Sequence, residues 1–314
     1  MRILLTGVNG QVGSALRSPL ASLGTVLAVD RTVFDLARPG ELSVILDAMA
    51  PDLIVNPAAY TAVDQAEDER ELAYLINAEA PRAMAHWAAI HGVPIVHFST
   101  DYVFDGSGDR PWREDDPTAP LSVYGASKLA GETAVRKSGG THLVVRTSWV
   151  FASKGKNFLN TIVRLAGERS ELRIVADQVG APTSARSLAE GLIKILGVTA
   201  RGGRNEIARR FEATEGLVHV STSGEISWHG FACAIIDGLR RRGAELAVGS
   251  VTAIPTHEFP TKAVRPLNSR LDMSRLERVL GVRMPSWQDA LDWELDELGA
   301  PGGSLRLESA NGGI

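Results

Sequence analysis

The stretch TGVNGQVG (residues 6–13) decides the fold, because its three glycines join a short apolar run to an amphipathic one. The run before it has the composition of a buried strand, and the run after it, up to residue 23, that of a helix. Gly7, Gly10 and Gly13 let the backbone turn sharply and approach a diphosphate, whose charge is favoured at the N-terminus of a helix. The spacing is G-x-x-G-x-x-G rather than the commoner G-x-G-x-x-G. The stretch predicts a strand–turn–helix unit that binds a dinucleotide.

Strand-like and helix-like segments alternate through the first half of the chain. Short apolar runs, typical of strands buried on both faces, occupy residues 3–6, 25–30, 53–56, 95–100 and 143–147. Helices are expected between them, at residues 11–23, 39–50 and 67–91. This alternation predicts an α/β fold built on a doubly wound parallel sheet of the Rossmann type.

The pattern changes near residue 151. Helices are expected at residues 157–168, 186–196 and 228–242, separated by long polar or proline-bearing loops. We therefore expect a dinucleotide-binding domain in residues 1–150 and a smaller α/β substrate-binding domain mainly in residues 151–298, interleaved in sequence with the first. Residues 299–314 are rich in Gly and Ser and predict a flexible tail.

Composition and charge exclude several classes of protein. The 314 residues are 44% hydrophobic and 22% charged, as in an ordinary globular chain rather than a disordered or fibrous one. The formal net charge of -4 argues against a nucleic acid polymer as a partner. No apolar run approaches the roughly 18 residues of a membrane span. With Cys233 as the single cysteine and no recognisable signal peptide, we expect a cytoplasmic protein.

Asp30 ends the second apolar run and follows Gly10 at the distance expected of a ribose-binding carboxylate. Such a carboxylate accepts hydrogen bonds from the adenosine ribose of a dinucleotide. Its charge favours NADH, because the 2′-phosphate of NADPH would face it. Arg31 can offset that repulsion, so the sequence leaves both cofactors open.

Three polar residues indicate acid–base chemistry at a carbonyl group. Tyr124 and Lys128 are one helical turn apart and share a helix face. A nearby ammonium lowers the pKa of a phenol, so we expect Lys128 to prepare Tyr124 as a general acid or base. Thr100 ends the fourth apolar run, and ligands of open α/β sheets bind at the carboxyl ends of strands. Its hydroxyl can donate to a carbonyl oxygen that gains charge.

With these motifs the chain resembles the extended short-chain dehydrogenase/reductase superfamily and, within it, the dTDP-4-dehydrorhamnose reductase family. The resemblance runs from residue 1 to about residue 293. Its most specific stretches are residues 7–12, 61–64, 99–104, 124–132, 146–150, 157–158, 177–183, 265–266 and 268–272.

The resemblance implies a full set of contacts to NADH or NADPH. They are Gly7, Gly10, Gln11, Val12 and Gly13 at the diphosphate, Asp30 at the ribose, Asp35 and Leu36 at the adenine, Ala58, Ala59 and Tyr60 along the centre, and Phe98, Tyr124 and Lys128 near the nicotinamide.

The implied reaction is reduction of the C4 ketone of dTDP-4-dehydro-β-L-rhamnose, the last step of dTDP-L-rhamnose biosynthesis. In it Tyr124 donates the proton, Lys128 is its electrostatic partner and a ribose ligand, and Thr100 assists the acid. The dTDP-sugar would contact Thr100, Asp101, Tyr124 and Trp149. Arg265 is expected to clamp the substrate diphosphate, because a guanidinium binds phosphate bidentately.

Two positions depart from the family pattern. Some members bridge a homodimer with magnesium through a carboxylate on the first helix, where this chain has Ala15. We therefore expect no metal, and a homodimer stays open. Pro57 stands where a small flexible residue is usual and stiffens its loop.

Two other functions stay open at this level. One is a nucleotide-sugar epimerase or dehydratase of the same superfamily, for which Asp101 is the only additional acid–base candidate beside Thr100. The other is a non-catalytic regulator that resembles the methionine adenosyltransferase β-subunit.

Overall fold

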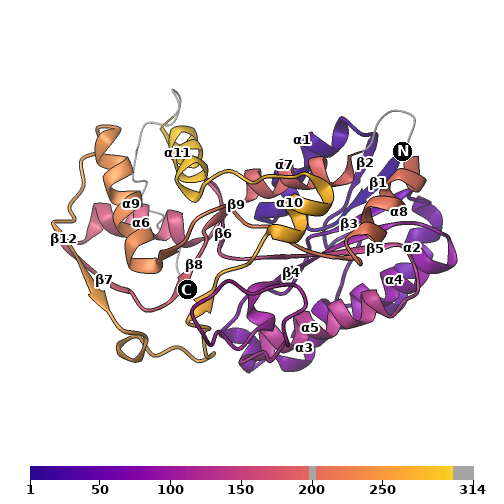
Figure 1. Ribbon diagram of the computed structural model, residues 1–314, viewed down its shortest axis with the longest axis horizontal. Coiled ribbons are helices and arrows are strands. Elements are labelled where there is room, and N and C mark those ends of the chain that lie inside the picture. Colours follow the sequence, from indigo (N-terminus) through magenta and orange to yellow (C-terminus); the bar gives the residue numbers. More distant parts are fainter. Residues whose placement is uncertain (198–202, 300–314) are drawn as a thin grey trace.

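A six-stranded parallel sheet forms the centre of the larger lobe (Figure 1). The computed structural model describes residues 1–197 and 203–299. The strand order is β10-β5-β4-β3-β1-β2, and every neighbouring pair is parallel. The strands are β1 (Arg2–Leu5), β2 (Thr25–Ala28), β3 (Leu53–Asn56), β4 (Ile95–Thr100), β5 (His142–Thr147) and β10 (Leu217–His219). Because the chain order reverses at β1 and β3, their carboxyl ends open a crevice in which such sheets bind ligands.

Helices cover both faces of the sheet. Side chains alternate along each strand, so Ile3 and Leu5 join the core on one face and Leu4 the core on the other. The first face is covered by α1 (Gln11–Ala21), α7 (Ala185–Leu196), α8 (Gly203–Ala213) and α10 (Ser274–Leu280). The second is covered by α2 (Leu42–Met49), α4 (Ala80–Ile90) and α5 (Val123–Arg136). These layers confirm the predicted doubly wound α/β fold.

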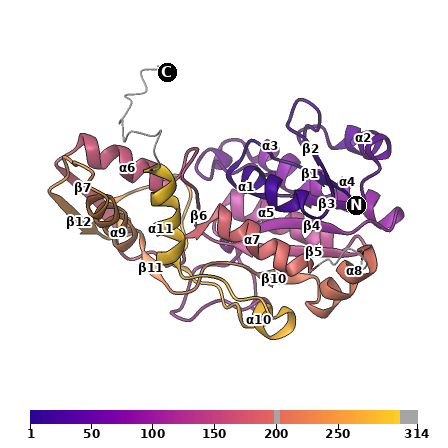
Figure 2. The same ribbon diagram turned by 90° about the horizontal axis from the view of Figure 1, so that it is seen from above.

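A smaller lobe lies beyond the carboxyl ends of the strands (Figures 1 and 2). Its helices and main strands are α6 (Phe158–Glu168), β7 (Glu171–Val175), α9 (Trp228–Arg241), β12 (Ser250–Ile254) and α11 (Trp287–Leu298). They enclose a separate core around Phe151, Leu159 and Phe231. Short strands link the lobes: β6 (Val150–Phe151) pairs with β9 (Thr183–Ser184), and β8 (Val179–Gly180) lies between β11 (Ile226–Ser227) and β13 (Asn268–Ser269).

Segments far along the chain return to the sheet. Helices α7, α8 and α10 and strand β10 all follow residue 150, yet they pack on the larger lobe. The division into domains at residues 1–150 and 151–298 stays a prediction. The expected interleaving of the two domains in sequence corresponds to these returning segments. Of the expected tail, residues 300–314 lie outside the described part of the chain.

The long helix expected at residues 67–91 is interrupted. The chain forms a 3-10 turn (Gln65–Glu67), α3 (Arg70–Tyr74), a π-turn (Leu75–Glu79) and then α4. In the π-turn the Asn77 side chain accepts a hydrogen bond from the Tyr60 backbone N–H at 2.8 Å and donates one to the Tyr60 carbonyl at 3.1 Å. The π-turn therefore places the buried Asn77 side-chain amide against the loop after β3. Turns of this kind are frequent at functional sites.

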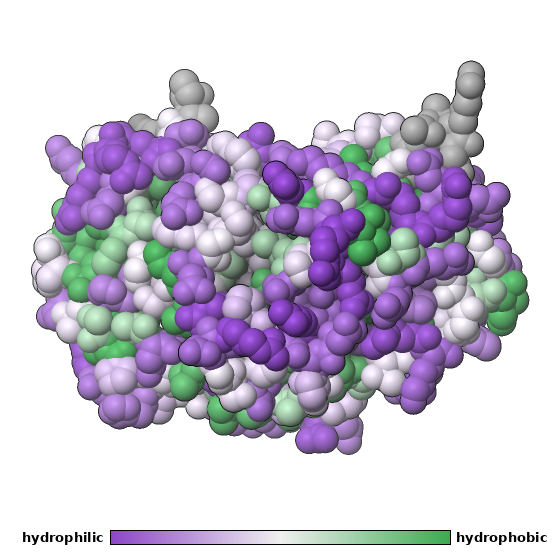
Figure 3. Space-filling view, in the orientation of Figure 1, coloured by the Kyte–Doolittle hydropathy of each residue, from purple (hydrophilic) through white to green (hydrophobic). Residues whose placement is uncertain are grey.

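Polar side chains dominate the face of the molecule in Figure 3, and its apolar side chains gather in separate small patches. Among residues 1–197 and 203–299, no helix combines the length and the apolarity that crossing a membrane requires.

Candidate active site

The turn between β1 and α1 brings the backbone against the loop after β3. Gly7 has a φ of 60°, and a Cβ there would lie 2.9 Å from the Cα of Ala58. A Cβ on Gly13 would lie 2.1 Å from the Gly7 carbonyl oxygen. The Gly10 N–H donates to that same carbonyl at 2.9 Å. Only glycines permit this close packing, and it produces the narrow turn at a helix N-terminus that a dinucleotide diphosphate needs.

Asp30 lies just beyond the end of β2, as predicted for a ribose ligand. Its carboxylate accepts hydrogen bonds from the hydroxyl and the backbone N–H of Thr32, which lower its pKa and keep it charged. Asp35 accepts a bond from the Ala37 N–H at 2.9 Å, and the Leu36 side chain is buried. The structure therefore places this predicted adenosine-binding group on one loop.

Two arginines lie on the same loop. Arg31 and Arg38 line a cavity of about 190 Å³ together with Asp35 and Ile45. Arg31 follows Asp30 in sequence, and Arg38 pairs with Asp35 and Glu41. With cations on the same loop as Asp30, both NADH and NADPH fit its charges.

Ala58, Ala59 and Tyr60 follow β3 and lie opposite the glycine turn. Besides its backbone bonds to Asn77, Tyr60 donates its hydroxyl proton to Glu69 at 2.8 Å. Burial, followed by that carboxylate, raises the pKa of Tyr60 to about 12. Tyr60 therefore stays neutral, and its segment is fixed before any ligand binds.

Thr100 and Asp101 stand at the carboxyl end of β4, near the centre of the sheet. Both are buried, and the Thr100 hydroxyl donates to Asp101 at 3.0 Å. Burial raises the pKa of Asp101 to about 6, although hydrogen bonds from Ser269 and Thr100 oppose the shift. Thr100 also accepts a bond from the Tyr102 N–H at 3.2 Å, which fixes the side chain at the strand end.

Tyr124 and Lys128 occupy the first turns of α5, whose N-terminus is capped by Ser122. The Lys128 amine is buried and donates to the Phe98 carbonyl at 2.6 Å. Burial lowers the pKa of Lys128 to about 8. Burial also raises the pKa of Tyr124, while its interaction with Thr100 opposes the rise. The expectation that Lys128 lowers the pKa of Tyr124 is therefore wrong for the protein without ligands, because desolvation of the phenol dominates.

Arg265 lies next to this group through Tyr102. One end of its guanidinium donates to the Tyr102 hydroxyl at 3.1 Å, and the other pairs with Asp64 at 2.6 Å. The Tyr102 ring meets the Tyr124 ring edge-on at 5.5 Å. The predicted diphosphate ligand is therefore one side chain away from the predicted acid.

Trp149 follows β5 with a φ of 49°, a left-handed conformation that side-chain-bearing residues seldom adopt. Its ring stacks on Trp228 at 3.6 Å. A Cβ on Gly180 would lie 2.8 Å from the Trp149 ring, so the absence of a side chain there makes room for it. The strained backbone thus aims the indole at the junction of the two lobes.

Gln11 joins the glycine turn to the smaller lobe. Its side-chain carbonyl accepts a hydrogen bond from Asn157 at 2.9 Å, and Asn157 also caps α6. The predicted cofactor-binding turn and the loop before α6 are therefore in direct contact.

Comparison with known proteins shows the family of the chain. A family profile described as the RmlD substrate binding domain matches residues 1–299. The chain belongs to this RmlD family. A relative from Burkholderia thailandensis named dTDP-4-dehydrorhamnose reductase is 48% identical over 293 residues, which cover 93% of this chain and 97% of the relative. An Escherichia coli K12 protein of the same name is 44% identical over 95% of this chain and 98% of its own length.

Solved structures agree with the RmlD family. The dTDP-4-dehydrorhamnose reductase of Bacillus anthracis, solved in complex with NADP, has a TM-score of 0.83 and 34% identity, over 94% of this chain and 99% of that one. The counterpart from Clostridium acetobutylicum has a TM-score of 0.85 and 34% identity, over 95% of this chain and 100% of that one.

Ala15, which is expected to offer no metal ligand, lines a cavity of about 650 Å³ beside the glycine turn. Two carboxylates of that cavity already have partners: Glu190 pairs with Arg186, and Glu294 accepts a bond from the Ser153 N–H at 2.6 Å. Within residues 1–197 and 203–299, no cluster of three or more His, Cys, Asp or Glu side chains could hold a metal ion. That no magnesium ion bridges two copies of the chain stays a prediction.

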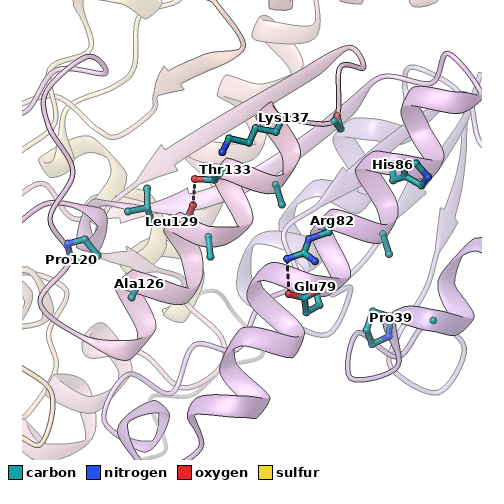
Figure 4. Close-up of a pocket in the computed structure, with 14 residues that line it drawn as sticks. Pro39, Glu79, Arg82, His86, Pro120, Ala126, Leu129, Thr133 and Lys137 are labelled. Atoms are coloured by element: carbon teal, nitrogen blue, oxygen red, sulfur yellow. Dashed lines mark hydrogen bonds and ion pairs between the residues drawn. The ribbon is translucent and has the colours of Figure 1, made fainter.

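A cavity of about 1010 Å³ lies away from this site, between the outer sides of α4 and α5 (Figure 4). In Figure 4, α5 carries Ala126, Leu129 and Thr133, and the neighbouring α4 carries Arg82 and His86. Arg82 is paired with Glu79 at 2.8 Å. Tyr124 and Lys128 are not among its lining residues. The face of α5 that carries Tyr124 and Lys128 and this groove are thus separate surfaces of one helix.

Sequence reasoning missed three residues of the site region. Asn77 holds the Tyr60 backbone and donates to Ser127 at 3.0 Å. Tyr102 links Arg265 to Tyr124. Trp228, which the sequence places in packing, stacks on Trp149. The position of Tyr102 within the specific stretch 99–104 was an available signal, whereas nothing local distinguishes the other two.

Proposed function

We propose that this chain is a dTDP-4-dehydrorhamnose reductase, which reduces the C4 ketone of dTDP-4-dehydro-β-L-rhamnose with NADH or NADPH. The observation that carries the proposal is the presence of Thr100 at the end of β4 and of Tyr124 and Lys128 on α5, in a chain 48% identical to a relative of that name. The product is dTDP-L-rhamnose, and the reaction is the last step of its biosynthesis.

The residues of the glycine turn fit a dinucleotide. Gly7, Gly10, Gln11, Val12 and Gly13 would receive the diphosphate, Asp30 the ribose, Asp35 and Leu36 the adenine, and Ala58, Ala59, Tyr60 and Phe98 the remainder. The fit is supported by the contact between Gly7 and Ala58, which leaves no space for a side chain at the turn. When bound, the nicotinamide supplies the hydride for the ketone carbon.

Tyr124 supplies the proton in this reaction. Its raised pKa keeps the phenol protonated at neutral pH, as a general acid requires. As the ketone oxygen gains charge, the hydroxyls of Tyr124 and Thr100 donate to it and stabilise the developing alkoxide. Lys128, held at the Phe98 carbonyl, would orient the nicotinamide ribose and favour the phenolate that remains after proton transfer.

Asp101, Trp149 and Arg265 would hold the substrate around the reacting carbon. Asp101 orients Thr100 through their hydrogen bond and can accept from a sugar hydroxyl. Trp149 offers an apolar face to the sugar, and Arg265 offers its guanidinium to the diphosphate. Holding the ketone in line with the hydride accounts for a large part of such catalysis.

The decisive test is the loss of nicotinamide absorbance when the purified protein meets dTDP-4-dehydro-L-rhamnose with NADH and then with NADPH. Rapid oxidation with dTDP-L-rhamnose as product is expected, and the ratio of the two rates gives the cofactor preference. Absence of oxidation with both cofactors, from folded protein that binds nucleotide, would refute the proposal. Tightly bound, non-exchanging NAD would then favour an epimerase or dehydratase, and co-purification with an adenosyltransferase a regulatory subunit. The cytoplasmic location stays a prediction, and a homodimer stays open.

A further inference from the structure

Three buried polar side chains cross the sheet beneath α5, at the carboxyl ends of its central strands. This polar row consists of Thr6 directly after β1, Asn56 at the end of β3 and His97 in β4. Asn56 and His97 are neighbours in the parallel register of β3 and β4, and all three side chains are buried. Buried polar groups need hydrogen-bond partners, so the contacts of the row show what it is built to hold.

The hydrogen bonds of the polar row end at Lys128. The Thr6 hydroxyl donates to Asn56 Oδ1 at 2.6 Å, and Asn56 Nδ2 lies 3.1 Å from His97 Nδ1. His97 Nε2 lies 3.5 Å from Lys128 Nζ. At the other end of the row, Thr6 Oγ1 accepts from the Ala58 N–H at 3.4 Å. The row therefore connects the proposed cofactor loop with the proposed ribose ligand.

The amine and the imidazole at the end of the row differ in how they titrate. Burial, and then the nearby Lys128 ammonium, hold the pKa of His97 well below its ordinary range, so the ring stays neutral. Burial lowers the pKa of Lys128 to about 8, and Glu132 on the next turn of α5 opposes this shift. Arg146 of β5 pairs with Glu132 at 2.7 Å, and Tyr124 on the preceding turn stays protonated. Lys128 therefore changes its charge at a pH where its neighbours keep theirs.

The polar row has two self-consistent arrangements, one for each charge of Lys128. A neutral imidazole has one nitrogen that donates and one that accepts, and an ammonium can only donate. In the structure Asn56 Nδ2 faces the ring, so Nδ1 accepts, and the ring proton on Nε2 points at Lys128. Only an uncharged amine can accept that proton. An ammonium requires the reverse, with Nε2 accepting, Nδ1 donating and the Asn56 oxygen turned toward the ring.

We propose that His97 is a positioning residue whose tautomer follows the charge of Lys128, with the Asn56 amide turning to match it. One proton is added overall, on Nζ, while the ring keeps one proton and changes the nitrogen that carries it. The hydrogen bond from the ammonium is the stronger of the two, so His97 favours the charged amine. The inference rests on the proposed function, because that function places Lys128 at the nicotinamide ribose and beside the phenolate of Tyr124.

Nitrogen NMR of protein with isotope-labelled histidine rings tests the tautomer directly and needs no substrate. As the pH rises through about 8, the ring proton of His97 should move from Nδ1 to Nε2. Lys128→Met should abolish this change, and the spectrum of His97→Gln assigns the ring. His142 is the internal control, because its Nδ1 donates to the Gly140 carbonyl at 2.8 Å and should keep its proton at every pH.

Two substitutions should move the alkaline limb of the pH profile of kcat in opposite directions. His97→Leu removes an acceptor of the ammonium, so kcat should fall at a pH about one unit lower, the effect of one hydrogen bond to a charged group. Asn56→Asp can only accept from the ring, which leaves Nε2 free to accept from Lys128, so kcat should persist to a pH about one unit higher. His97→Gln has an amide oxygen that can accept from Lys128 and should restore most of the wild-type profile. Damage to packing alone lowers kcat without moving the limb in opposite directions.

The outcomes separate this inference from the reductase proposal. If His97 keeps one tautomer between neutral pH and the ordinary lysine pKa of 10.5, or still changes it in Lys128→Met, the inference is wrong and the reductase proposal stands. An alkaline limb that coincides in the wild type, His97→Leu and Asn56→Asp would likewise refute the role of His97. If the tautomer follows Lys128 but no variant or wild type reduces dTDP-4-dehydro-L-rhamnose, the reductase proposal alone fails.

Discussion

Tyr124 and Lys128 share one face of α5 but depend on different partners. The Lys128 amine is buried against the Phe98 carbonyl, and the Tyr124 phenol interacts with Thr100. The tyrosine–lysine spacing alone predicts that the two side chains share a face, but the protein environment decides their proton affinities. Desolvation disfavours the charged form of both groups, so it raises the pKa of Tyr124 and lowers the pKa of Lys128.

Replacement of Tyr124 by Phe tests the proton donor. Tyr124→Phe should lower turnover by about 10²-fold or more, the contribution of a general acid, while NADPH affinity changes little. Steady-state kinetics and a cofactor titration measure the two effects separately. Tyr74→Phe, at a partly exposed tyrosine of α3, should leave both unchanged. Near-wild-type turnover in Tyr124→Phe would assign the proton to another group.

Lys128 makes stability depend on pH in the alkaline range. Its native pKa of about 8 lies below the ordinary 10.5, so between these values the unfolded chain binds more protons than the native protein. Native stability therefore rises with pH in this window, and below about pH 8 the full cost of burying the amine is present. Relative to Lys128→Met, the wild type should gain up to about 3 kcal/mol between pH 8 and 10.5.

Urea unfolding of both proteins across that pH range measures the difference. Lys137→Met, at an exposed lysine of the same segment, serves as the control and should run parallel to the wild type. A constant difference between wild type and Lys128→Met would show that the amine is not desolvated.

At the scale of elements, the sequence predicted best where burial alone decides the structure. The runs that became β3 and β4 were predicted with their observed bounds, because strands buried on both faces are apolar throughout. Strand β10 was missed, since three residues are too short for a pattern. The π-turn was missed as well, because it depends on a contact between Asn77 and Tyr60 that no local pattern contains.

That π-turn also requires a glycine on α5. A Cβ at Gly131 would lie 2.0 Å from the Asn77 carbonyl oxygen. Gly131→Ala should therefore push α5 away from the turn and destabilise the protein by about 1–3 kcal/mol, although alanine favours helices. It should also raise the KM for cofactor, since α5 carries Lys128 and the turn holds Tyr60.

Gly40→Ala is the matched control for this substitution, because a Cβ at Gly40 would meet no atom within 4 Å. Thermal unfolding should separate the two variants by several degrees. An unchanged Tm in Gly131→Ala would mean that α5 and the turn move apart without cost.

At the scale of the molecule, the lobes meet through polar contacts that begin at predicted ligand-binding positions. Asp64 of the larger lobe pairs with Arg265, and Gln11 of the glycine turn accepts from Asn157 of the smaller lobe. Such pairings join residues far apart in sequence, so periodicity could not predict them. Sequence analysis predicts Gln11 and Arg265 as site residues, but only the structure shows their contacts with the opposite lobe.

Asn157 offers a test of that connection. Asn157→Asp keeps a side-chain oxygen at the position that caps α6, so the helix cap should persist. It replaces the amide, which donates to Gln11 and to the Ala152 and Lys154 carbonyls, by an oxygen. This breaks the contact between the lobes, weakens the loop before α6 and places a negative charge beside the proposed diphosphate position. We expect NADPH affinity to fall about tenfold and Tm to fall by a few degrees, measured by fluorescence titration and thermal unfolding. Asn157→Ser keeps a helix cap without the negative charge, so it should lose less NADPH affinity than Asn157→Asp. Equal losses in the two variants would attribute the effect to the broken contact alone. Unchanged affinity in both variants would show that the glycine turn binds cofactor independently of the smaller lobe.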